Sequence, residues 1–319
     1  MLLRGLRWGL AGALVAWTLI RLLGLDRGWP LVPLFAFTPW VAAFALAVAI
    51  VAAVLRWRVF ALVAGGCAIV LAVAIAPPVI PNRALEDAPG VRLRVLSANV
   101  AGETATGDDL RALIRRYRPD VLSVLELPPE VVRAYDAAGI GELLPHQVLE
   151  PRPGFTGTGL YSRIPLRAAP KPDTLFSIAS ASVAPEGAAP LELYAVHARA
   201  PTSPDRTAQW RSDLRALPPS GNGGLRILAG DFNATLDHHE FRRLLARGYR
   251  DAAEQAGNGV QMTWSVKRSF PPATVAIDHV LADRRVHVAS TRIVTIPGSD
   301  HRGVLAELVL PRDTDRGGG

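Results

Sequence analysis

Two long apolar runs near the start of the chain set the strongest constraint on its fold. Residues 31–55 and residues 59–80 contain no charged side chain, over 25 and 22 positions respectively. An α-helix rises about 1.5 Å per residue, so each run is long enough to cross the roughly 30 Å hydrocarbon core of a bilayer. We therefore predict that both runs form transmembrane helices.

A third apolar run, residues 8–20, is shorter because Arg21 interrupts it. Since this run follows Arg4 and Arg7, it also matches the apolar core of a secretory signal peptide, which is the alternative interpretation. No small-x-small cleavage site follows, however, and apolar residues continue beyond Arg21, whose long side chain can reach the interface from near a helix end. We expect a transmembrane module over residues 1–82, with three helices at 6–25, 31–55 and 59–80.

Positive charge is concentrated in this module. Residues 1–83 carry seven arginines and one acid, whereas residues 84–319 carry 28 basic and 27 acidic residues. A nearly neutral domain lacks the positive field that non-specific DNA binding requires. The favoured partner is therefore a lipid bilayer, and nucleic acid is not favoured.

The distribution of arginines around the apolar runs predicts the topology. Arg4, Arg7, Arg56 and Arg58 flank the helices on one side, whereas only Arg27 and Arg83 flank them on the other. By the positive-inside rule the N-terminus is cytoplasmic and everything after the third helix is extracytoplasmic, in a multi-pass protein of the cell membrane. The chain has a single cysteine, Cys67, which lies within the run at residues 59–80; this excludes a disulfide scaffold or a cysteine-based phosphatase.

The remaining sequence predicts one domain. Residues 83–90 are rich in proline and charge and indicate a short linker, residues 91–310 form the domain, and residues 311–319 are expected to be a disordered tail. Alternating or continuous apolar patterns predict strands at 91–96, 121–125, 159–162, 177–183, 191–197, 226–229, 275–281, 286–295 and 303–310. Amphipathic patterns predict helices at 108–117, 204–217 and 238–246. Many strands with few helices indicate the α+β class, as a four-layer α/β/β/α sandwich of two packed sheets with helices outside.

Polar residues that can bind metal or carry protons recur beside the predicted strands. One such residue alone is usually structural: a lone histidine is often a satisfied core residue, and an Asp-x-Asn is usually a turn. If the strand ends gather at one rim, however, the whole set converges on a single cleft. These residues are Asn99, Glu126, His197, Asp231, Asn233, Asp278, Asp300 and His301.

These residues belong to seven short motifs. In chain order the motifs are Ser97-Ala98-Asn99, Leu125-Glu126, Gly159-Leu160-Tyr161-Ser162-Arg163, Val196-His197, Gly230-Asp231-Phe232-Asn233-Ala234, Ile277-Asp278-His279-Val280-Leu281 and Ser299-Asp300-His301-Arg302. The ordered set resembles that of the endonuclease/exonuclease/phosphatase superfamily, which has the DNase I-like fold. The resemblance spans residues 91–310. The arrangement of a few N-terminal spans before a compact domain further resembles membrane-anchored bacterial members, including the VanJ-like proteins.

The resemblance implies metal-dependent hydrolysis of phosphate esters. It assigns Glu126 as a ligand of Mg²⁺, with help from Asn99 and Asp300, and Mn²⁺ can substitute. Asp231 is then the general base for the attacking water, and Asn233 holds water or phosphate from the same loop.

Two histidines and a tyrosine have implied roles at the phosphate. His301 binds the scissile phosphate, and Asp278 hydrogen-bonds its ring. His197 matches the family histidine that contacts phosphate or protonates the leaving oxygen. Asn99 and Tyr161 are expected to contact the substrate, although Tyr161 can equally be a packed strand residue. His238, at a predicted helix start, is expected to lie in a solvated first turn rather than in a metal site.

The fold hosts several activities, so the substrate stays open at this point. The favoured hypothesis is a phosphoesterase acting on a lipid-linked phosphate or pyrophosphate, such as a polyprenyl carrier, at the outer membrane face. The alternatives are a tethered extracellular nuclease and a non-catalytic sensor on the same fold. The sequence contains no GxSxG elbow, Walker loop or GxGxxG motif, which excludes serine hydrolases, P-loop enzymes and dinucleotide folds of those types.

Overall fold

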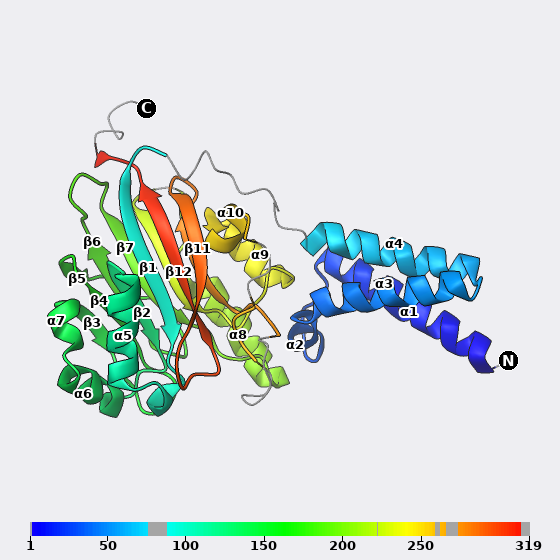
Figure 1. The fold of residues 1–319 in the computed structure, drawn as a ribbon, viewed down its shortest axis with the longest axis horizontal. Coiled ribbons are helices and arrows are strands. Elements are labelled where there is room, and N and C mark those ends of the chain that lie inside the picture. Colours follow the sequence, from blue (N-terminus) through cyan, green and yellow to red (C-terminus); the bar gives the residue numbers. More distant parts are fainter. Residues whose placement is uncertain (1, 76–87, 222, 259–261, 266–273, 314–319) are drawn as a thin grey trace.

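The structure is a computed structural model in which a helical module precedes a two-sheet domain (Figure 1). It describes residues 2–75, 88–221, 223–258, 262–265 and 274–313. Most of the predicted linker, the end of the third predicted helix and all but the first three residues of the predicted tail lie outside these ranges. The described part of that tail is ordered, since Pro311 accepts a backbone hydrogen bond from Ala189 (3.2 Å).

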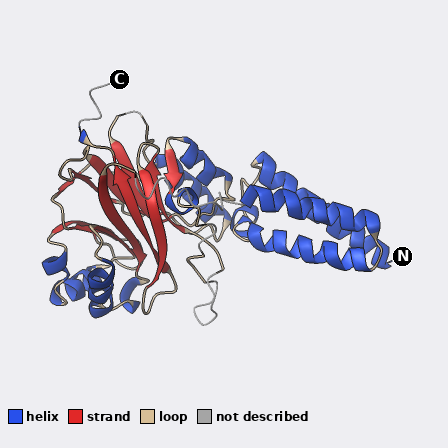
Figure 2. Cartoon of the chain, turned by 45° about the horizontal axis from the view of Figure 1, so that its top comes forward, coloured by secondary structure: helices blue, strands red, loops and turns tan. Residues whose placement is uncertain are grey.

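The N-terminal module contains three long helices and one short helix. Their bounds are α1 Leu2–Leu23, α2 Leu31–Phe35, α3 Thr38–Val54 and α4 Arg58–Ile75. The three long helices lie side by side and extend away from the domain (Figures 1 and 2). Among described residues, Arg4–Leu23 and Arg58–Ile75 are long and apolar enough to cross a membrane by length and composition, and α3 is shorter at 17 residues.

The prediction of one continuous helix over residues 31–55 is wrong. The helix breaks between Phe35 and Thr38, and the second part begins with a proline at one of its first two positions. Pro39 has no N–H group to donate to a preceding turn, and its fixed backbone angle favours the start of a helix. The apolar run therefore yields the short helix α2, which contacts the domain, and the long helix α3.

The surface of the module is apolar. Within the described residues, every large hydrophobic side chain that is mostly exposed belongs to the module, apart from Phe155 and Leu175. The interior of the bundle is made largely of small side chains such as Ala45, Ala49 and Ala64. Folding the bundle therefore leaves its larger apolar side chains outward, which is unusual for a surface that faces water.

The domain is built from two sheets of six strands. The first has the order β11 (His287–Thr295), β12 (Arg302–Leu310), β1 (Val91–Asn99), β2 (Val121–Leu125), β4 (Thr158–Ser162) and β3 (His146–Glu150). The second has the order β5 (Leu166–Ala168), β6 (Ala179–Val183), β7 (Leu191–His197), β8 (Leu225–Asp231), β10 (Asp278–Asp283) and β9 (Tyr249–Asp251). Both sheets are mixed, because β1 and β2 are parallel, as are β7 and β8, while their other neighbours are antiparallel.

Side chains alternate between the two faces of each strand. The apolar ones form three layers, one between the two sheets and one on the outer face of each sheet. In β1, Leu93 and Val95 belong to the core between the sheets, whereas Leu96 and Ala98 face the opposite way. The outer layer of the first sheet contains side chains from α5 (Gly107–Tyr117), α6 (Pro129–Ala137) and α7 (Ile140–Leu143). The outer layer of the second contains side chains from α8 (Pro204–Ala216) and α9 (His239–Ala246). The remaining short helices are η2 (Gly102–Thr104) and α10 (Ala252–Gln255).

Two further differences from the expected fold concern individual strands and short helices of the domain. The strand predicted at 275–281 begins at Asp278, so this residue starts a strand instead of following one. The short elements α6, α7, β3, β5, β9 and α10 were not predicted, because each is too brief for a periodic pattern to stand out. The proline at the start of α6 is nevertheless typical of the first turn of a helix.

The strand registers bring the polar positions to one rim, as the sequence analysis required. Asn99 pairs with Leu125 in the parallel β1–β2 ladder, directly before Glu126. His197 pairs with Asp231 in the parallel β7–β8 ladder, and Asp278 pairs with Asp231 across the antiparallel β10–β8 ladder.

Gly230 allows β7 and β8 to approach closely at this rim. A Cβ atom at this position would lie 1.8 Å from the carbonyl oxygen of Val196, a distance that no packing adjustment of a side chain can relieve. The glycine is therefore required for the placement of His197 beside Asp231.

We expect Gly230→Ala to lower the free energy of unfolding by about 2–3 kcal/mol, because the new methyl group forces the two central strands apart. Urea unfolding followed by tryptophan fluorescence measures the change. Gly224→Ala is the matched control, since no atom lies within 4 Å of a Cβ atom there. Equal midpoints for the two variants would contradict the packing argument.

Candidate active site

A cleft of about 310 Å³ opens at the rim where the strand ends meet. Six of the residues expected from the sequence line it: Glu126, His197, Asp231, Asn233, Asp300 and His301. Two more, Asn99 and Asp278, lie directly behind these and contact them. The structure therefore brings together eight positions spread over more than two hundred residues of sequence.

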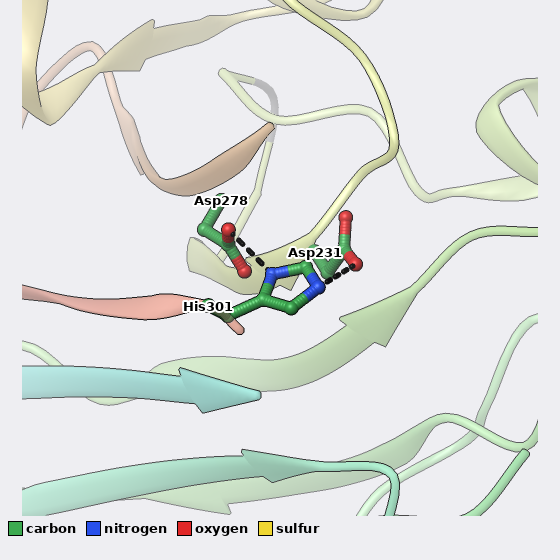
Figure 3. Close-up of side chains that lie close together, drawn as sticks. All are labelled: Asp231, Asp278 and His301. Carbon is green, nitrogen blue, oxygen red and sulfur yellow. Dashed lines mark hydrogen bonds and ion pairs between the residues drawn. The ribbon is translucent and has the colours of Figure 1, made fainter. Parts of the chain in front are cut away.

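The centre of the site is an imidazole between two buried carboxylates (Figure 3). His301 Nδ1 lies 2.9 Å from Asp278 Oδ2, and His301 Nε2 lies 3.8 Å from Asp231 Oδ2. All three side chains are at least nine-tenths buried. The expected contact between Asp278 and His301 is present, and it leaves Nε2 facing the cleft.

These carboxylates control the charge of His301. Burial alone disfavours the imidazolium form, but Asp278, Asp231 and Asp300 outweigh burial and raise the pKa of His301 to about 10. The ring is therefore a cation at neutral pH. A cationic N–H donor at this place suits a phosphate oxygen.

Asp231 is held in place by the turn that follows it. Its Oδ1 accepts the backbone N–H of Asn233 at 2.8 Å, and Oδ2 lies 3.3 Å from Asn99 Nδ2. Burial and the charge of Asp278 raise the pKa of Asp231. A divalent cation nearby would lower this pKa again and keep the carboxylate ionised, as a general base requires.

Asn99 is buried behind the cleft and donates to two of the cleft carboxylates. Its Oδ1 accepts the backbone N–H of Ala101 at 3.0 Å, which fixes the orientation of the amide because a backbone N–H can only donate. Nδ2 consequently points at Glu126 Oε1 (3.2 Å) and Asp231 Oδ2 (3.3 Å). This geometry favours neither the substrate contact nor the metal ligation expected for Asn99, and instead makes Asn99 the residue that orients Glu126 and Asp231.

Glu126 and Asp300 offer the oxygen atoms that a hard cation prefers. Burial raises the pKa of Glu126, and the carboxylates of Asp300 and Asp278 raise it further, against the hydrogen bond from Asn99. Asp278 Oδ1 is also buried, with no hydrogen-bond partner in the described structure. Several carboxylates thus share a partly buried space with one imidazolium, and a divalent cation would stabilise this arrangement.

The closest cluster of potential ligands is different from the expected one. Ligand atoms of Asp231, Asp278 and His301 lie within 4.8 Å of one another. The hydrogen bond between Asp278 and His301 already explains this proximity, and a protonated imidazole cannot ligate a metal. The chemistry of the donors therefore favours Glu126 and Asp300 as the residues that would hold the ion.

His197 differs from His301 in charge. Burial and the positive charge of His301 together lower the pKa of His197 to about 4. Its Nε2 lies 3.7 Å from Asp231 Oδ2, while Nδ1 is buried without a partner among the described residues. A neutral ring can still donate an N–H to a phosphate oxygen, so the geometry favours phosphate contact over proton donation to the leaving oxygen.

Two site residues have left-handed backbone conformations. Glu126 has φ of 59° and Asn233 has φ of 46°. Asparagine tolerates this region, but for glutamate it costs roughly 1–2 kcal/mol. Asn233 is further fixed by its Nδ2, which donates to the carbonyl of Ala198 at 2.9 Å. Backbone strain of this kind occurs at sites where a side chain is held in one orientation toward a ligand.

Tyr161 does not reach the cleft. It is 1% exposed and packs in the outer apolar layer with residues such as Leu122 and Tyr135. Side chains alternate along β4, and Tyr161 lies on the sheet face that the helices α5, α6 and α7 cover. The expected phosphate contact from Tyr161 is therefore replaced by the packing role.

Part of the cleft wall was not predicted from the sequence. Arg199, which follows β7, and Arg206, which lies in α8, line the cleft, and so do Phe155 and Phe176. Phe155 is 58% exposed and stacks edge-on against Phe176, with ring centroids 5.8 Å apart. The position of Arg199, two residues after His197, is the one signal that could have indicated it.

The comparisons with known proteins agree with this geometry. The Endonuclease/Exonuclease/phosphatase family model matches residues 96–301. An endonuclease/exonuclease/phosphatase from Beutenbergia cavernae DSM 12333 is similar with a TM-score of 0.53 and 22% identity, over 69% of this chain and 72% of that chain. Zebrafish (D. rerio) TDP2 complexed with single strand DNA product has a TM-score of 0.52 and 21% identity, over 68% of this chain and 98% of that chain.

A third structure is the 3' phosphatase NExo from Neisseria bound to product DNA hairpin, with a TM-score of 0.52 and 18% identity, over 67% of this chain and 98% of that chain. No curated protein sequence matches the chain. At these identities the structures show a common fold. The family match covers more than half of the chain and includes every site residue named above, and the chain therefore belongs to the Endonuclease/Exonuclease/phosphatase family.

Proposed function

We propose that this protein is a membrane-anchored, Mg²⁺-dependent phosphoesterase that hydrolyses a phosphate or pyrophosphate ester at the extracytoplasmic face. The observation that carries the proposal is the His301 imidazolium held between Asp278 and Asp231 beside Glu126. This array offers a cationic phosphate contact, a carboxylate base and oxygen ligands in one cleft. The family match over residues 96–301 supports the same chemistry.

Each residue of the site has a distinct task in this mechanism. The phosphate binds with its oxygens at the rings of His301 and His197, which line the cleft, while Asn99 orients the carboxylates of Glu126 and Asp231 from behind. Asp231 accepts a proton from the attacking water, and the fixed loop around Asn233 holds that water in line. Asp278 keeps the His301 ring oriented and charged. Mg²⁺ bound by Glu126 and Asp300 would neutralise charge on the phosphoryl oxygens.

The anchoring proposal rests on the surface and charge of the helical module. The end that points away from the domain carries Arg4, Arg7 and Arg58, and the Arg7 guanidinium lies 4.1 Å above the Trp57 ring. No acidic residue lies in residues 1–25. Together with the apolar outer surface, this positive end fits helices that cross a bilayer with the arginines inside and the catalytic domain outside.

Labelling of introduced cysteines tests this topology. We expect a cysteine at the exposed position of Asp205 to react with a membrane-impermeant maleimide in intact cells, and one at Arg58 to react only after lysis. The background contains a single thiol, Cys67, which is buried in the bundle. The reverse pattern, or equal labelling at both positions, would contradict the orientation.

The arginines of the cleft wall favour a substrate with more than one anionic group. Within the described residues the Arg199 guanidinium makes no hydrogen bond or ion pair, and Arg206 makes only one, to Thr202 Oγ1 (3.0 Å). The exposed ring of Phe155 lies at the same cleft and offers an apolar contact. A prenyl pyrophosphate combines both features, with one phosphate at His301 and the other at Arg199.

The second candidate is a tethered nuclease. It is favoured by the DNA present with TDP2 and with NExo in their solved structures. The near neutrality of residues 84–319 argues against it, because 28 basic residues are balanced by 27 acidic ones. Release of phosphate from prenyl pyrophosphates, compared with cleavage of plasmid and single-stranded DNA by the same purified protein, decides between the two. Strong DNA cleavage without phosphate release would reverse the ranking.

We expect His301→Ala and Glu126→Ala each to lower turnover by at least about 100-fold, because each removes a group that stabilises the transition state. His287→Ala, at an exposed position on β11, is the matched control and should retain full activity. Circular dichroism confirms that the fold is retained. Activity close to that of the wild type in either variant would refute the assignment.

The same variants separate metal binding from chemistry. Mg²⁺ should raise the Tm of the wild-type protein and of His301→Ala, since a ligand that binds only the folded state stabilises it. Glu126→Ala should show little increase. If Mg²⁺ raised the Tm of Glu126→Ala as much as that of the wild type, Glu126 would not be a ligand.

We expect Arg199→Met to lower kcat/KM for a prenyl pyrophosphate by about 10- to 100-fold, the value of one or two charge-assisted hydrogen bonds. The loss for the corresponding monophosphate should be no more than about 2-fold, because only one anionic group is then bound. Arg167→Met, at an exposed position of β5, serves as the control for loss of positive charge. Equal losses for both substrates would remove the argument for a second phosphate.

A further inference from the structure

The helical module and the catalytic loop are joined by several buried contacts. The loop from Ala234 to His238 follows directly after Asp231 and Asn233 and leads into α9. Arg21, near the end of α1, and Val32, in α2, contact this loop, and Asp26, between the two helices, contacts the first residue of α9. The junction therefore lies only a few residues from the proposed general base.

An ion pair forms the centre of this junction. Arg21 Nε lies 2.6 Å from Asp237 Oδ1, and the side chains of the two residues are only 9% and 5% exposed. Arg21 also donates to the carbonyl oxygen of Leu236 at 3.4 Å. Contrary to the expectation that it reaches the membrane interface, Arg21 is thus directed into the protein. Removing either partner would leave a buried charge uncompensated.

A carboxylate from the module caps α9. Asp26 is 1% exposed, and its Oδ2 accepts the backbone N–H of His239 at 2.9 Å, at the first residue of the helix. A carboxylate at this position satisfies a free N–H and interacts favourably with the positive end of the helix dipole. The catalytic loop is therefore fixed at Asp237 and again at His239.

His238 completes the junction and is not solvated, contrary to our expectation. Its Nδ1 must accept, because it lies 2.8 Å from the backbone N–H of Thr235. Nε2 then carries the proton and donates to the carbonyl oxygen of Val32 at 2.7 Å. Burial lowers the pKa of His238, which agrees with a neutral ring in this tautomer. The ring thus connects the loop to helix α2.

Apolar contacts also link the N-terminal module to the residues around Asp231 and Asn233. Val32 is fully buried in the outer layer of the second sheet, in the same cluster as Phe232 and Trp210. Phe232 stands between Asp231 and Asn233, and its carbonyl oxygen accepts the Trp210 Nε1 hydrogen bond at 3.0 Å. A side chain of the N-terminal module is therefore part of the apolar layer that supports the catalytic turn.

We propose that Arg21 and Asp26 are positioning residues of the active site, through which the N-terminal module holds the loop of Asp231 and Asn233 in its catalytic geometry. The module is then a structural part of the site as well as an anchor. This inference rests on the proposed hydrolytic function. It differs from a simple tether, which would affect only substrates embedded in the membrane.

The proposal predicts a particular kinetic change. A displacement of about 1 Å in a catalytic group can lower the rate by about 100-fold, whereas binding of a small substrate at His301 and the metal depends little on the loop. For the full-length protein in detergent, with Mg²⁺ and the soluble substrate bis(p-nitrophenyl) phosphate, Arg21→Met should lower kcat by about 10- to 100-fold and change KM by no more than about 2-fold.

Three further variants make the test specific. Arg21→Lys keeps the charge and should restore most of kcat, and Asp237→Asn should reproduce the loss from the other side of the pair. Arg27→Met is the matched control, because Arg27 is exposed at the same end of the module. Wild-type kcat in Arg21→Met and in Asp237→Asn, or an equal loss in Arg27→Met, would overturn the proposal.

Hydrogen exchange gives a readout that does not depend on turnover. Exchange of the peptide that covers residues 231–239 should be faster in Arg21→Met, while the peptide that covers β2 should exchange as in the wild type. Unchanged exchange at 231–239 would overturn the proposal, as would faster exchange throughout the domain, which indicates general destabilisation. Faster local exchange in a protein whose wild type hydrolyses no phosphoester would support the coupling and overturn the proposed function.

Discussion

Repulsion between buried carboxylates is the constraint on which the site and the rest of the domain depend. Glu126, Asp231, Asp278 and Asp300 come together around the single imidazolium of His301. Ionised groups at such separations destabilise the folded state unless positive charge compensates them. The apolar layers on both faces of each sheet supply the rigidity that holds the carboxylates together, and a divalent cation bound there would supply the remaining charge. Stability and the proposed catalysis would then depend on the same ion.

Much of this arrangement could be predicted from the sequence, because it depends on local patterns. Alternating apolar residues locate the central strands, and a polar residue at the end of a strand indicates a rim position whatever the neighbouring strand is. Asn99, Glu126 and His197 follow this logic. Asp278 also reached the rim, although it begins a strand instead of ending one. Parallel pairing of β1 with β2 and of β7 with β8 explains why these positions coincide.

The remaining features depend on contacts that no local pattern encodes. Tyr161 has a motif position that suggests the cleft, but the alternation of β4 directs it to the outer layer. Pro39 accounts for the break in the helix over residues 31–55, but the apolar run contains no sign that α2 contacts the domain. Arg21 and His238 read as an interfacial arginine and a solvated cap when taken alone, yet both are buried against residues more than two hundred positions away.

The ion pair between Arg21 and Asp237 has a consequence for biogenesis. Its partners are separated by 216 positions, so a ribosome has completed most of the domain before the pair can form. Contacts of such long range close late in folding, because the entropy of a large loop must be overcome first. During translation the Arg21 guanidinium therefore lacks its carboxylate partner and has only the carbonyl oxygen of Ala74 within the module, until the segment that leads into α9 has emerged.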